Sequence, residues 1–379
     1  MSENSQTLPV IVSELTLAKG KVAGQLTLNK PKALNALDLE MAEIMLGALQ
    51  AWATRDDIAF VLMDAVQDKA FCAGGDIVSM YQAMQKNPDS VPHFVKTFFA
   101  VEYRLDFTIR TYQKPVIAWG HGIVMGGGMG LMSGASHRVV TDASRLAMPE
   151  ISIGLYPDVG GTYFLPRLPG KTGLFLGLTG ASINATDALY VGLADHYCAA
   201  GDKQNILDVL ANEELSDSAS VDKAISAALA SFAVNESDRI AGQVERHRTQ
   251  IDKVCDASTL ADAVQGIQAL SASDDKWLAK AQKTLAGGSP ITAHIVYEQI
   301  RRGQSMTLAE CFRAELGISC RCGEYGEFQE GVRALLIDKD NKPAWKFKDV
   351  ESVPEDVVNY FFSDPWEGEP HPLATLGEK

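Results

Sequence analysis

Two acidic residues in an apolar, turn-rich stretch are candidates for acid–base chemistry. Glu150 and Asp158 stand eight positions apart, and glycine, proline and apolar residues dominate the segment Gly154–Gly161 around the second. Burial among such side chains raises the pKa of a carboxyl group, and a raised pKa suits a general acid or base. The spacing also allows a structural interpretation, in which one carboxylate caps a helix and the other forms an ion pair.

A run of three glycines, Gly126–Gly128, follows an apolar run that predicts a buried strand. Glycine lets a ligand approach the backbone closely, and a helix that begins there directs free N–H groups at that ligand. Close packing of the helix on the strand is the structural alternative. The spacing of Gly120, Gly122 and Gly126 differs from that of a dinucleotide-binding fingerprint.

A second glycine turn, Phe71–Asp76, follows another apolar run. Two such turns on adjacent strands can aim two backbone N–H groups at one carbonyl oxygen. This arrangement is an oxyanion hole, which stabilises negative charge that develops in a transition state. By itself the turn is more typical of an ordinary loop than of a catalytic site.

Hydrophobic patterning predicts the elements that position these turns. The runs Val10–Leu17 and Val22–Leu28 predict a β-hairpin, and Asp38 is expected to cap a helix. Further strands are expected at Ala59–Met63, Pro115–Trp119 and His137–Thr141, and one long helix is expected at Phe94–Tyr112. Because strands, glycine-rich turns and helices alternate, residues 1–200 predict an α/β domain with parallel pairing.

The pattern changes beyond Cys198. Gly201–Leu285 shows no clear strand pattern and is rich in Ala, Asp and Ser, which predicts helices with polar connections. The segments Ser289–Arg302 and Thr307–Gly317 continue this helical pattern. We therefore expect two parts, a core of residues 1–200 and a mainly helical region of residues 201–379 that packs on it.

Composition excludes several classes of protein. The chain has 379 residues, of which 46% are apolar, so a largely disordered protein is excluded. A formal net charge of -14 argues against a broad nucleic-acid-binding surface. No segment approaches the ~18 successive apolar residues that a membrane span needs, so no membrane partner is expected.

Six scattered cysteines are typical of a protein from a reducing compartment. Cys320 and Cys322 form the only close pair, and neither a second pair nor a suitably spaced histidine completes a metal site. The segment Met1–Pro9 contains Glu3 and no Lys or Arg, so neither a secretory signal nor a basic transit peptide is expected. The predicted location is cytoplasmic.

In this order, the motifs resemble those of the crotonase, or enoyl-CoA hydratase/isomerase, superfamily. The resemblance rests on Asn29-Lys-Pro-Lys-Ala-Leu-Asn-Ala-Leu37, Lys69-Ala-Phe-Cys-Ala-Gly-Gly-Asp76, Lys114–Gly128 and Met148-Pro-Glu150. It implies a spiral of ββα repeats, with residues 1–200 as an acyl-CoA-binding catalytic core. It also implies a coenzyme A thioester whose carbonyl oxygen lies between two backbone N–H groups. Coenzyme A is then part of the substrate, and no separate cofactor is expected.

The resemblance assigns site residues by position. The two N–H donors are expected to be those of Gly75 and Gly127. The substrate-binding residues that it implies in the same way are Lys32, Ala33, Leu34 and Ala73. A lysine near the adenosine end of coenzyme A can meet phosphate, although a solvated surface lysine is the common alternative.

One position departs from the hydratase pattern. Hydratases place a glutamate two residues after the triple glycine, where this chain has Gly130, which cannot transfer a proton. The combination of Glu150 and Asp158 instead resembles the 3-hydroxyisobutyryl-CoA hydrolase branch, as does the late stretch Phe328–Asp340. In that branch a glutamate matching Glu102 is also a substrate-site residue. From the sequence without the resemblance, Glu102 is an ordinary helix-surface charge.

The resemblance therefore implies hydrolysis of a short 3-hydroxyacyl-CoA thioester. Its favoured substrate is 3-hydroxyisobutyryl-CoA, from valine breakdown, with 3-hydroxypropionyl-CoA second. Glu150 is expected either to attack the acyl carbon or to activate water, while Asp158 orients the substrate hydroxyl or the water. An enoyl-CoA isomerase or hydratase on the same fold, and a non-catalytic acyl-CoA-binding protein, remain open alternatives. A homo-oligomer is an open expectation, because crotonase relatives often assemble as trimers.

Overall fold

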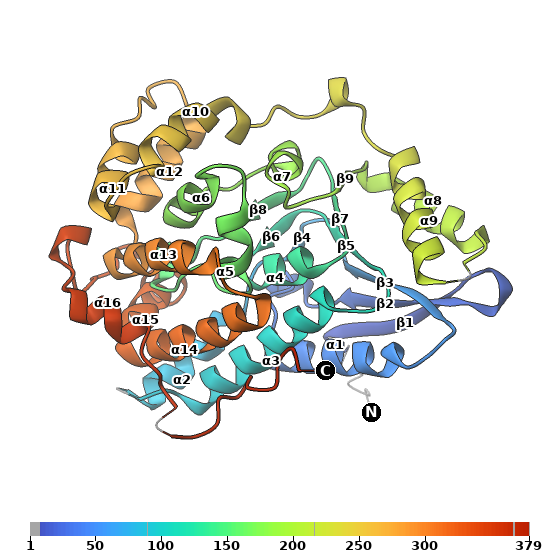
Figure 1. Ribbon diagram of the computed structural model, residues 1–379, viewed down its shortest axis with the longest axis horizontal. Helices are drawn as coiled ribbons and strands as arrows, with labels where there is room; N and C mark the ends of the chain where they lie inside the picture. Colours follow the sequence, from blue (N-terminus) through green and yellow to red (C-terminus); the bar gives the residue numbers. More distant parts are fainter. Residues whose placement is uncertain (1–7, 89, 216, 367, 379) are drawn as a thin grey trace, which may run out of the picture. The chain divides into compact units, whose positions relative to one another are not determined.

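The computed structural model describes residues 8–88, 90–215, 217–366 and 368–378 (Figure 1). The chain forms two compact units, each built from three separate segments. The first contains Met1–Gly75, Thr108–Leu146 and Asn184–Ala241, and the second contains Asp76–Phe107, Ala147–Ile183 and Gly242–Lys379. These units are defined by internal contacts, and the expected boundary of the catalytic core near residue 200 stays a prediction.

A six-stranded sheet forms the framework of the first unit within the described ranges. In spatial order its strands are β1 (Val10–Thr16), β2 (Val22–Leu28), β3 (Ile58–Ala65), β5 (Val116–Gly120), β7 (His137–Val140) and β9 (His196–Tyr197). β1 and β2 pair antiparallel, which confirms the predicted hairpin, and every other neighbouring pair is parallel. The predicted α/β class with parallel pairing is therefore confirmed.

A second, three-stranded sheet carries the glycine turns. Its order is β4 (Ala70–Cys72), β6 (Ile123–Met125) and β8 (Arg145–Ala147). β4 and β6 are parallel, with Ala70 opposite Ile123 and Cys72 opposite Val124. Because both strands run in the same direction, the turns that follow them lie at the same edge of this sheet.

The helices of the first unit cover these sheets. They are α1 (Leu39–Ala53), α4 (Gly127–Gly134), α7 (Ala185–Val191), α8 (Lys203–Asn212) and α9 (Ser218–Ser231). Asp38 caps α1 as predicted, since its side chain accepts a hydrogen bond from the Met41 N–H at 2.9 Å. The cap satisfies one of the donors that a helix leaves free at its N-terminus.

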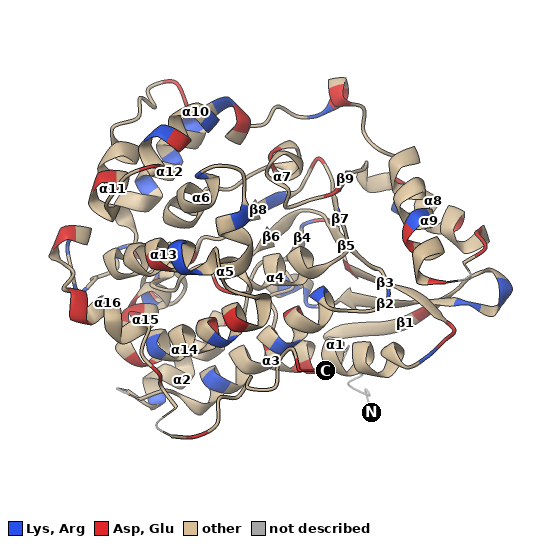
Figure 2. Cartoon of the chain, viewed as in Figure 1, with Lys and Arg blue, Asp and Glu red and all other residues tan. Residues whose placement is uncertain are grey.

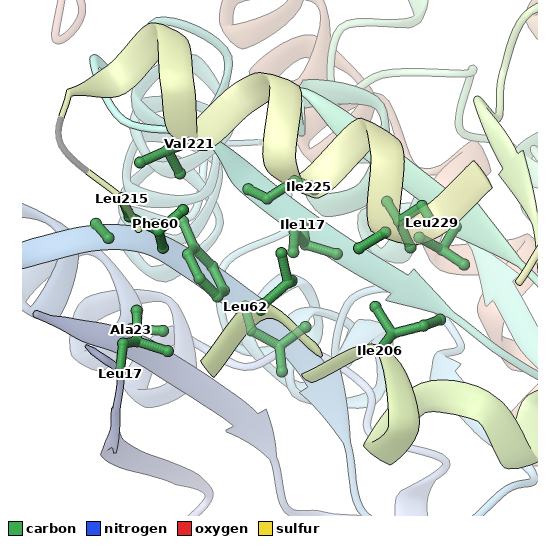
Figure 3. Close-up of a cluster of buried hydrophobic side chains, with 14 of the residues drawn as sticks. Leu17, Ala23, Phe60, Leu62, Ile117, Ile206, Leu215, Val221, Ile225 and Leu229 are labelled. Atoms are coloured by element: carbon green, nitrogen blue, oxygen red, sulfur yellow. The ribbon is translucent and has the colours of Figure 1, made fainter. Parts of the chain in front are cut away.

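One apolar cluster joins the sheet of the first unit to α8 and α9. Figure 3 shows Val221, Ile225 and Leu229 of α9 directed toward Phe60 and Ile117 of the sheet. The three α9 residues are spaced four apart, so they lie on one face of the helix. The helical pattern predicted beyond residue 201 thus has its apolar stripe buried against the sheet.

The second unit is mainly helical. Its helices are α2 (Ile77–Lys86), α3 (His93–Arg110, which continues into the first unit), α5 (Gly161–Phe164), α6 (Thr172–Thr179), α10 (Val244–Cys255), α11 (Leu260–Gln268), α12 (Lys276–Gly287), α13 (Pro290–Gly303), α14 (Leu308–Tyr325), α15 (Glu327–Val332) and α16 (Glu355–Phe361). A π-helical turn, Arg333–Ile337, follows α15. The helical character expected for residues 201–379 is therefore confirmed in the described ranges.

Asp64 of β3 is the centre of a buried hydrogen-bond network in the first unit. Its carboxylate is buried and accepts hydrogen bonds from Lys203 Nζ at 2.8 Å, Thr27 Oγ1 at 2.6 Å and Gln25 Nε2 at 3.0 Å. We expect Asp64→Ala to lower the free energy of unfolding by about 2–3 kcal/mol, because three polar groups lose their acceptor. Urea denaturation measures this loss.

Glu214→Ala is the matched control, since Glu214 pairs with Lys19 and both side chains are largely exposed. An exposed pair of this kind contributes about 0–1 kcal/mol. Equal losses in the two variants would contradict a stabilising role for the buried Asp64 network.

Among the described residues, every helix falls short of the length and apolar character that crossing a membrane requires. All six cysteines are buried and free of disulfide bonds. Residues 1–7, which carry most of the segment used for the targeting prediction, lie outside the described residues.

Candidate active site

The second unit places the two predicted carboxylates in its interior. Glu150 begins a short 3₁₀ turn, Glu150–Ile153, and Asp158 lies in the loop that leads into α5. Glu150 is 5% exposed and Asp158 is 3% exposed. Neither forms an ion pair within the described residues, and neither side chain caps a described helix. The structural interpretation of cap and ion pair is therefore wrong for this pair.

The surroundings raise the pKa of both carboxyl groups. Burial holds the pKa of Glu150 well above its usual range, and the nearby charge of Asp158 raises it further. Burial also raises the pKa of Asp158, to about 7, although a hydrogen bond from Tyr103 opposes this shift. Glu150 Oε2 has no hydrogen-bond partner in the part of the chain that the structure describes. A buried carboxylate with a free oxygen can bind a proton, a water molecule or a reacting group.

Glu102 lies inside the molecule and not on its surface. It belongs to α3, is 1% exposed, and its Oε1 atom has no partner among the described residues. Burial holds the pKa of Glu102 well above its usual range, and the charge of Asp158 adds to the effect. The interpretation of Glu102 as an ordinary helix-surface charge is therefore wrong, and its role in binding substrate stays a prediction.

Three further buried residues belong with Glu102, Glu150 and Asp158 in the second unit, and they were not identified from the sequence. Asp106 lies one turn after Glu102 on α3, and neither of its buried oxygens has a partner in the described ranges. The spacing of four along an amphipathic helix was the available signal for Asp106. Tyr103 and Glu315 are also fully buried here, and no local pattern distinguishes them from other helix residues.

Tyr103 binds Asp158 directly and gives a prediction about pH dependence. Its hydroxyl donates to Asp158 Oδ2 at 2.7 Å, which stabilises the ionised carboxylate. Tyr103→Phe keeps the ring but removes this donor, so the pKa of Asp158 should rise above about 7. If turnover needs ionised Asp158, the acidic limb of the pH–kcat/KM profile moves to higher pH.

Tyr360→Phe is the matched control for Tyr103→Phe. It removes another tyrosine hydroxyl that donates to a carboxylate, Glu324 Oε2, at 2.6 Å. The control should leave the acidic limb in place. An unchanged limb in Tyr103→Phe as well would show that this hydrogen bond does not influence the titrating group.

The first unit holds the two glycine turns. Gly127 is the first residue of α4, and N–H groups in the first turn of a helix lack partners within that helix. Gly126 before it has φ 48°, a conformation that glycine adopts readily. A Cβ atom on Gly128 would lie 2.3 Å from the Cys72 carbonyl oxygen, so α4 packs directly on the end of β4. Close packing and a free helix N-terminus therefore coexist at this turn.

The other turn contacts the segment expected to bind coenzyme A. The Ala73 N–H donates to the Leu34 carbonyl at 3.1 Å, and the Leu37 N–H donates to the Gly74 carbonyl at 2.8 Å. Leu37 also forms a parallel bridge with Gly75. Two of the predicted substrate-binding residues, Leu34 and Ala73, are thus adjacent. Lys32 and Ala33 are exposed in a 3₁₀ turn, Pro31–Ala33.

Four elements next to the two turns contain no charged residue, although Asp76 ends one of the turns. Figure 2 shows β4, β5, β6 and α4 without a Lys, Arg, Asp or Glu residue, as their sequences require. Backbone N–H groups in an apolar setting stabilise a developing oxyanion more strongly than they would in water. Gly75 and Gly127 belong to this first unit, whereas Glu102, Glu150 and Asp158 belong to the second.

No group of three or more His, Cys, Asp or Glu side chains in the described ranges has the arrangement of a metal site. Cys320 and Cys322, the one close pair in the sequence, are both buried on α14. Burial raises the pKa of both thiols, to about 12 for Cys320. Neutral thiols are poor metal ligands.

Comparison with known proteins identifies the family. The profile described as enoyl-CoA hydratase/isomerase matches residues 23–362, most of the chain. The chain belongs to the enoyl-CoA hydratase/isomerase family. This membership confirms the resemblance seen in the motifs, and it implies an acyl-CoA substrate for the enzyme.

Several curated relatives of this family member are named 3-hydroxyisobutyryl-CoA hydrolases. The chain is 38% identical to the mitochondrial enzyme of Danio rerio over 358 residues, covering 93% of this chain and 90% of that protein. It is 36% identical to the mitochondrial enzyme of Homo sapiens over 365 residues, covering 92% and 88%. These relatives are described as mitochondrial, whereas the cytoplasmic location of this chain stays a prediction.

Solved structures of the family share the fold. A carnitinyl-CoA dehydratase from Mycobacterium thermoresistibile matches with a TM-score of 0.83 and 33% identity, covering 98% of this chain and 100% of that one. An enoyl-CoA hydratase from Rhodobacter sphaeroides matches with a TM-score of 0.79 and 32% identity, covering 94% and 97%. The α/β crotonase fold with a helical C-terminal region is therefore confirmed.

Proposed function

We propose that this family member hydrolyses short 3-hydroxyacyl-CoA thioesters, with 3-hydroxyisobutyryl-CoA as the favoured substrate. The observation that carries the proposal is the buried pair Glu150 and Asp158, in which Glu150 keeps a free carboxylate oxygen. The names of the curated relatives support the same activity. Hydrolysis of this substrate would place the enzyme in valine breakdown.

In the proposed mechanism, the N–H groups of Gly75 and Gly127 bind the thioester carbonyl oxygen. Attack on the acyl carbon moves an electron pair to that oxygen, and the two N–H groups stabilise the resulting negative charge. When the carbonyl re-forms, the C–S bond breaks and coenzyme A leaves as a thiolate that takes up a proton. Asp158 orients the 3-hydroxyl group or the water molecule, and Glu102 helps to hold that hydroxyl group.

Glu150 has two possible roles in this scheme. As a nucleophile it forms a mixed anhydride, which water then opens to release the hydroxy acid. As a general base it takes a proton from water, which attacks the acyl carbon directly. A single turnover in ¹⁸O-labelled water separates the routes. Label in the Glu150 carboxylate supports an anhydride that water opens at the glutamyl carbon. An unlabelled carboxylate with label in the hydroxy acid shows that water attacks the acyl carbon, as direct attack requires.

Isomerisation or hydration on the same fold is the second candidate function. The two solved structures are named as a dehydratase and a hydratase, which favours this alternative. Gly130 argues against ordinary hydration, because this α4 position offers no side chain to transfer a proton. A thiol-trapping dye decides between the two, since hydrolysis releases free coenzyme A and the other reactions do not.

The acyl group is tested with a panel of substrates. We expect the highest kcat/KM for 3-hydroxyisobutyryl-CoA, with 3-hydroxypropionyl-CoA next, because one methyl group is worth only about 1–3 kcal/mol of discrimination. The panel also includes enoyl-CoA esters. Tight binding of every ester without turnover of any would indicate a non-catalytic acyl-CoA-binding protein instead.

A further inference from the structure

The loop that carries Asp158 has an unfavourable backbone conformation. Val159 has φ 48° and Gly160 has φ 90°. Glycine adopts such values readily, but a β-branched residue there is strained, by roughly 1–3 kcal/mol. The neighbouring structure must therefore hold this loop in place.

Glu315, which belongs to α14 and not to the loop, holds the loop backbone through hydrogen bonds. Its side chain is completely buried, and its two carboxylate oxygens accept hydrogen bonds from different backbone groups. Oε2 accepts from the Gly160 N–H and Oε1 accepts from the Thr162 N–H, each at 2.8 Å. Glu315 thus supplies acceptors to the start of α5, whose own N-cap residue, Gly160, has no side chain for this purpose.

Two further contacts fix the chain just before Asp158. The Gln299 side-chain amide of α13 donates to the Pro157 carbonyl at 2.5 Å. The Tyr156 hydroxyl donates to the Glu315 main-chain carbonyl at 2.7 Å. The backbone on both sides of Asp158 is therefore tied to α13 and α14.

The Asp158 side chain is tied to α14 as well. Ser319 lies one turn after Glu315, and its hydroxyl is 2.7 Å from the Tyr103 hydroxyl and 3.0 Å from that of Tyr156. Tyr103 in turn donates to Asp158 Oδ2. Because Tyr103 and Tyr156 direct their protons elsewhere, their oxygens are available to accept the single Ser319 proton.

We propose that Glu315 is a positioning residue of the active site, whose carboxylate holds the strained loop so that Asp158 faces the substrate. The inference rests on the proposed function, because it assumes that Asp158 takes part in turnover. Glu315 acts through backbone N–H groups and does not touch the substrate. The helical C-terminal region thereby contributes to the chemistry, through α14.

Glu315→Gln tests the proposal with little change of shape. A glutamine has one oxygen and one NH₂ group, so it accepts from only one of the two N–H groups and opposes the other. We expect kcat for 3-hydroxyisobutyryl-CoA to fall roughly 10–100-fold, because a displacement of about 1 Å can cost that much. KM should rise much less than kcat falls, since the proposed contacts to coenzyme A and to the thioester oxygen lie at other residues.

Glu327→Gln is the matched control, because Glu327 is another buried glutamate that accepts from a backbone N–H, that of Lys346, at 2.8 Å. Its kcat should stay within about twofold of the unmodified enzyme, as expected for a merely structural carboxylate. The inference would be overturned if Glu315→Gln had a lower melting temperature but an unchanged kcat, calculated from the concentration of folded enzyme.

Val159→Gly supplies an independent measurement. Glycine removes the strain at position 159, so the loop depends less on the hydrogen bonds from Glu315. The double variant Val159→Gly/Glu315→Gln should therefore have a kcat several-fold higher than that of Glu315→Gln. If Glu315→Gln folds and loses activity, a double variant no more active than Glu315→Gln would overturn the inference. If Glu315→Gln alone does not fold, the double variant should still be several-fold less active than Val159→Gly, and equal activity of these two variants would overturn the inference.

Asp158→Asn, measured in parallel, separates the two hypotheses. Near-normal turnover in Asp158→Asn would contradict the role of Asp158 in the proposed function, and therefore this inference as well. An inactive Asp158→Asn beside a normally active Glu315→Gln would overturn the inference alone. Losses in both variants, with the Glu327→Gln control unchanged, are the expected result.

Discussion

Glu150→Gln should lower kcat for thioester hydrolysis by about 10³-fold or more, while acyl-CoA affinity changes little. The amide keeps the size of the side chain but can neither attack the acyl carbon nor accept a proton from water. Binding should survive, because the proposed contacts to coenzyme A and to the thioester oxygen lie at Lys32–Leu34, Gly75 and Gly127. Release of free thiol measures turnover, and calorimetry with a non-hydrolysable acyl-CoA analogue measures affinity.

The control for Glu150→Gln is the same change at Glu327, a buried glutamate in the same unit that hydrogen-bonds to Ser289 and Lys346. Its turnover should be normal even if its melting temperature falls. Near-normal turnover in Glu150→Gln would exclude Glu150 as nucleophile or base. Equal losses of turnover and of binding would indicate a binding role instead.

Asp158→Asn should lower kcat by roughly 10²–10³-fold, in the range of lost acid–base or orienting groups. Asparagine is nearly isosteric, so the Tyr103 hydroxyl can still donate to its oxygen. The change removes a negative charge that raises the pKa of Glu150. If Glu150 must be ionised for turnover, the residual activity should therefore have its acidic limb at lower pH than in the unmodified enzyme.

This shift is opposite in sign to the one expected for Tyr103→Phe. The apparent pKa values belong to the coupled cluster and not to one residue, so the directions are the informative result. Asp275→Asn is the control, because Asp275 caps α12 in the same unit by accepting from the Leu278 N–H at 2.9 Å. A limb that moves to higher pH in Asp158→Asn would contradict the electrostatic coupling of Asp158 to Glu150.

Local pattern predicted the parts of the fold that depend on neighbouring residues. The α1 cap at Asp38 and the β1–β2 hairpin follow from capping chemistry and from alternation along short segments. The strand expected at Ala59–Met63 was observed as Ile58–Ala65, because the edges of an apolar run do not define where pairing stops. Parallel pairing followed from the order of strands and helices.

The candidate site was predicted only in part. Glu150 and Asp158 were accessible to sequence analysis because they lie in one short apolar segment. Burial of Glu102 was not, since a helix residue becomes buried only when another element packs on its face. The same holds for Glu315, whereas Asp106 lies four residues after Glu102 on α3, a spacing that could have indicated it.

The sequence by itself determined which residues can do chemistry, namely two glycine turns and a pair of carboxylates, because residue type and spacing define those groups. Only the tertiary structure decided which carboxylates share one buried environment and which groups hold Asp158. Tyr103 meets Asp158 across 55 positions and Ser319 across 216 positions of the chain. Contacts at such separations, and the loss of water that shifts the pKa values, arise only when distant segments pack together.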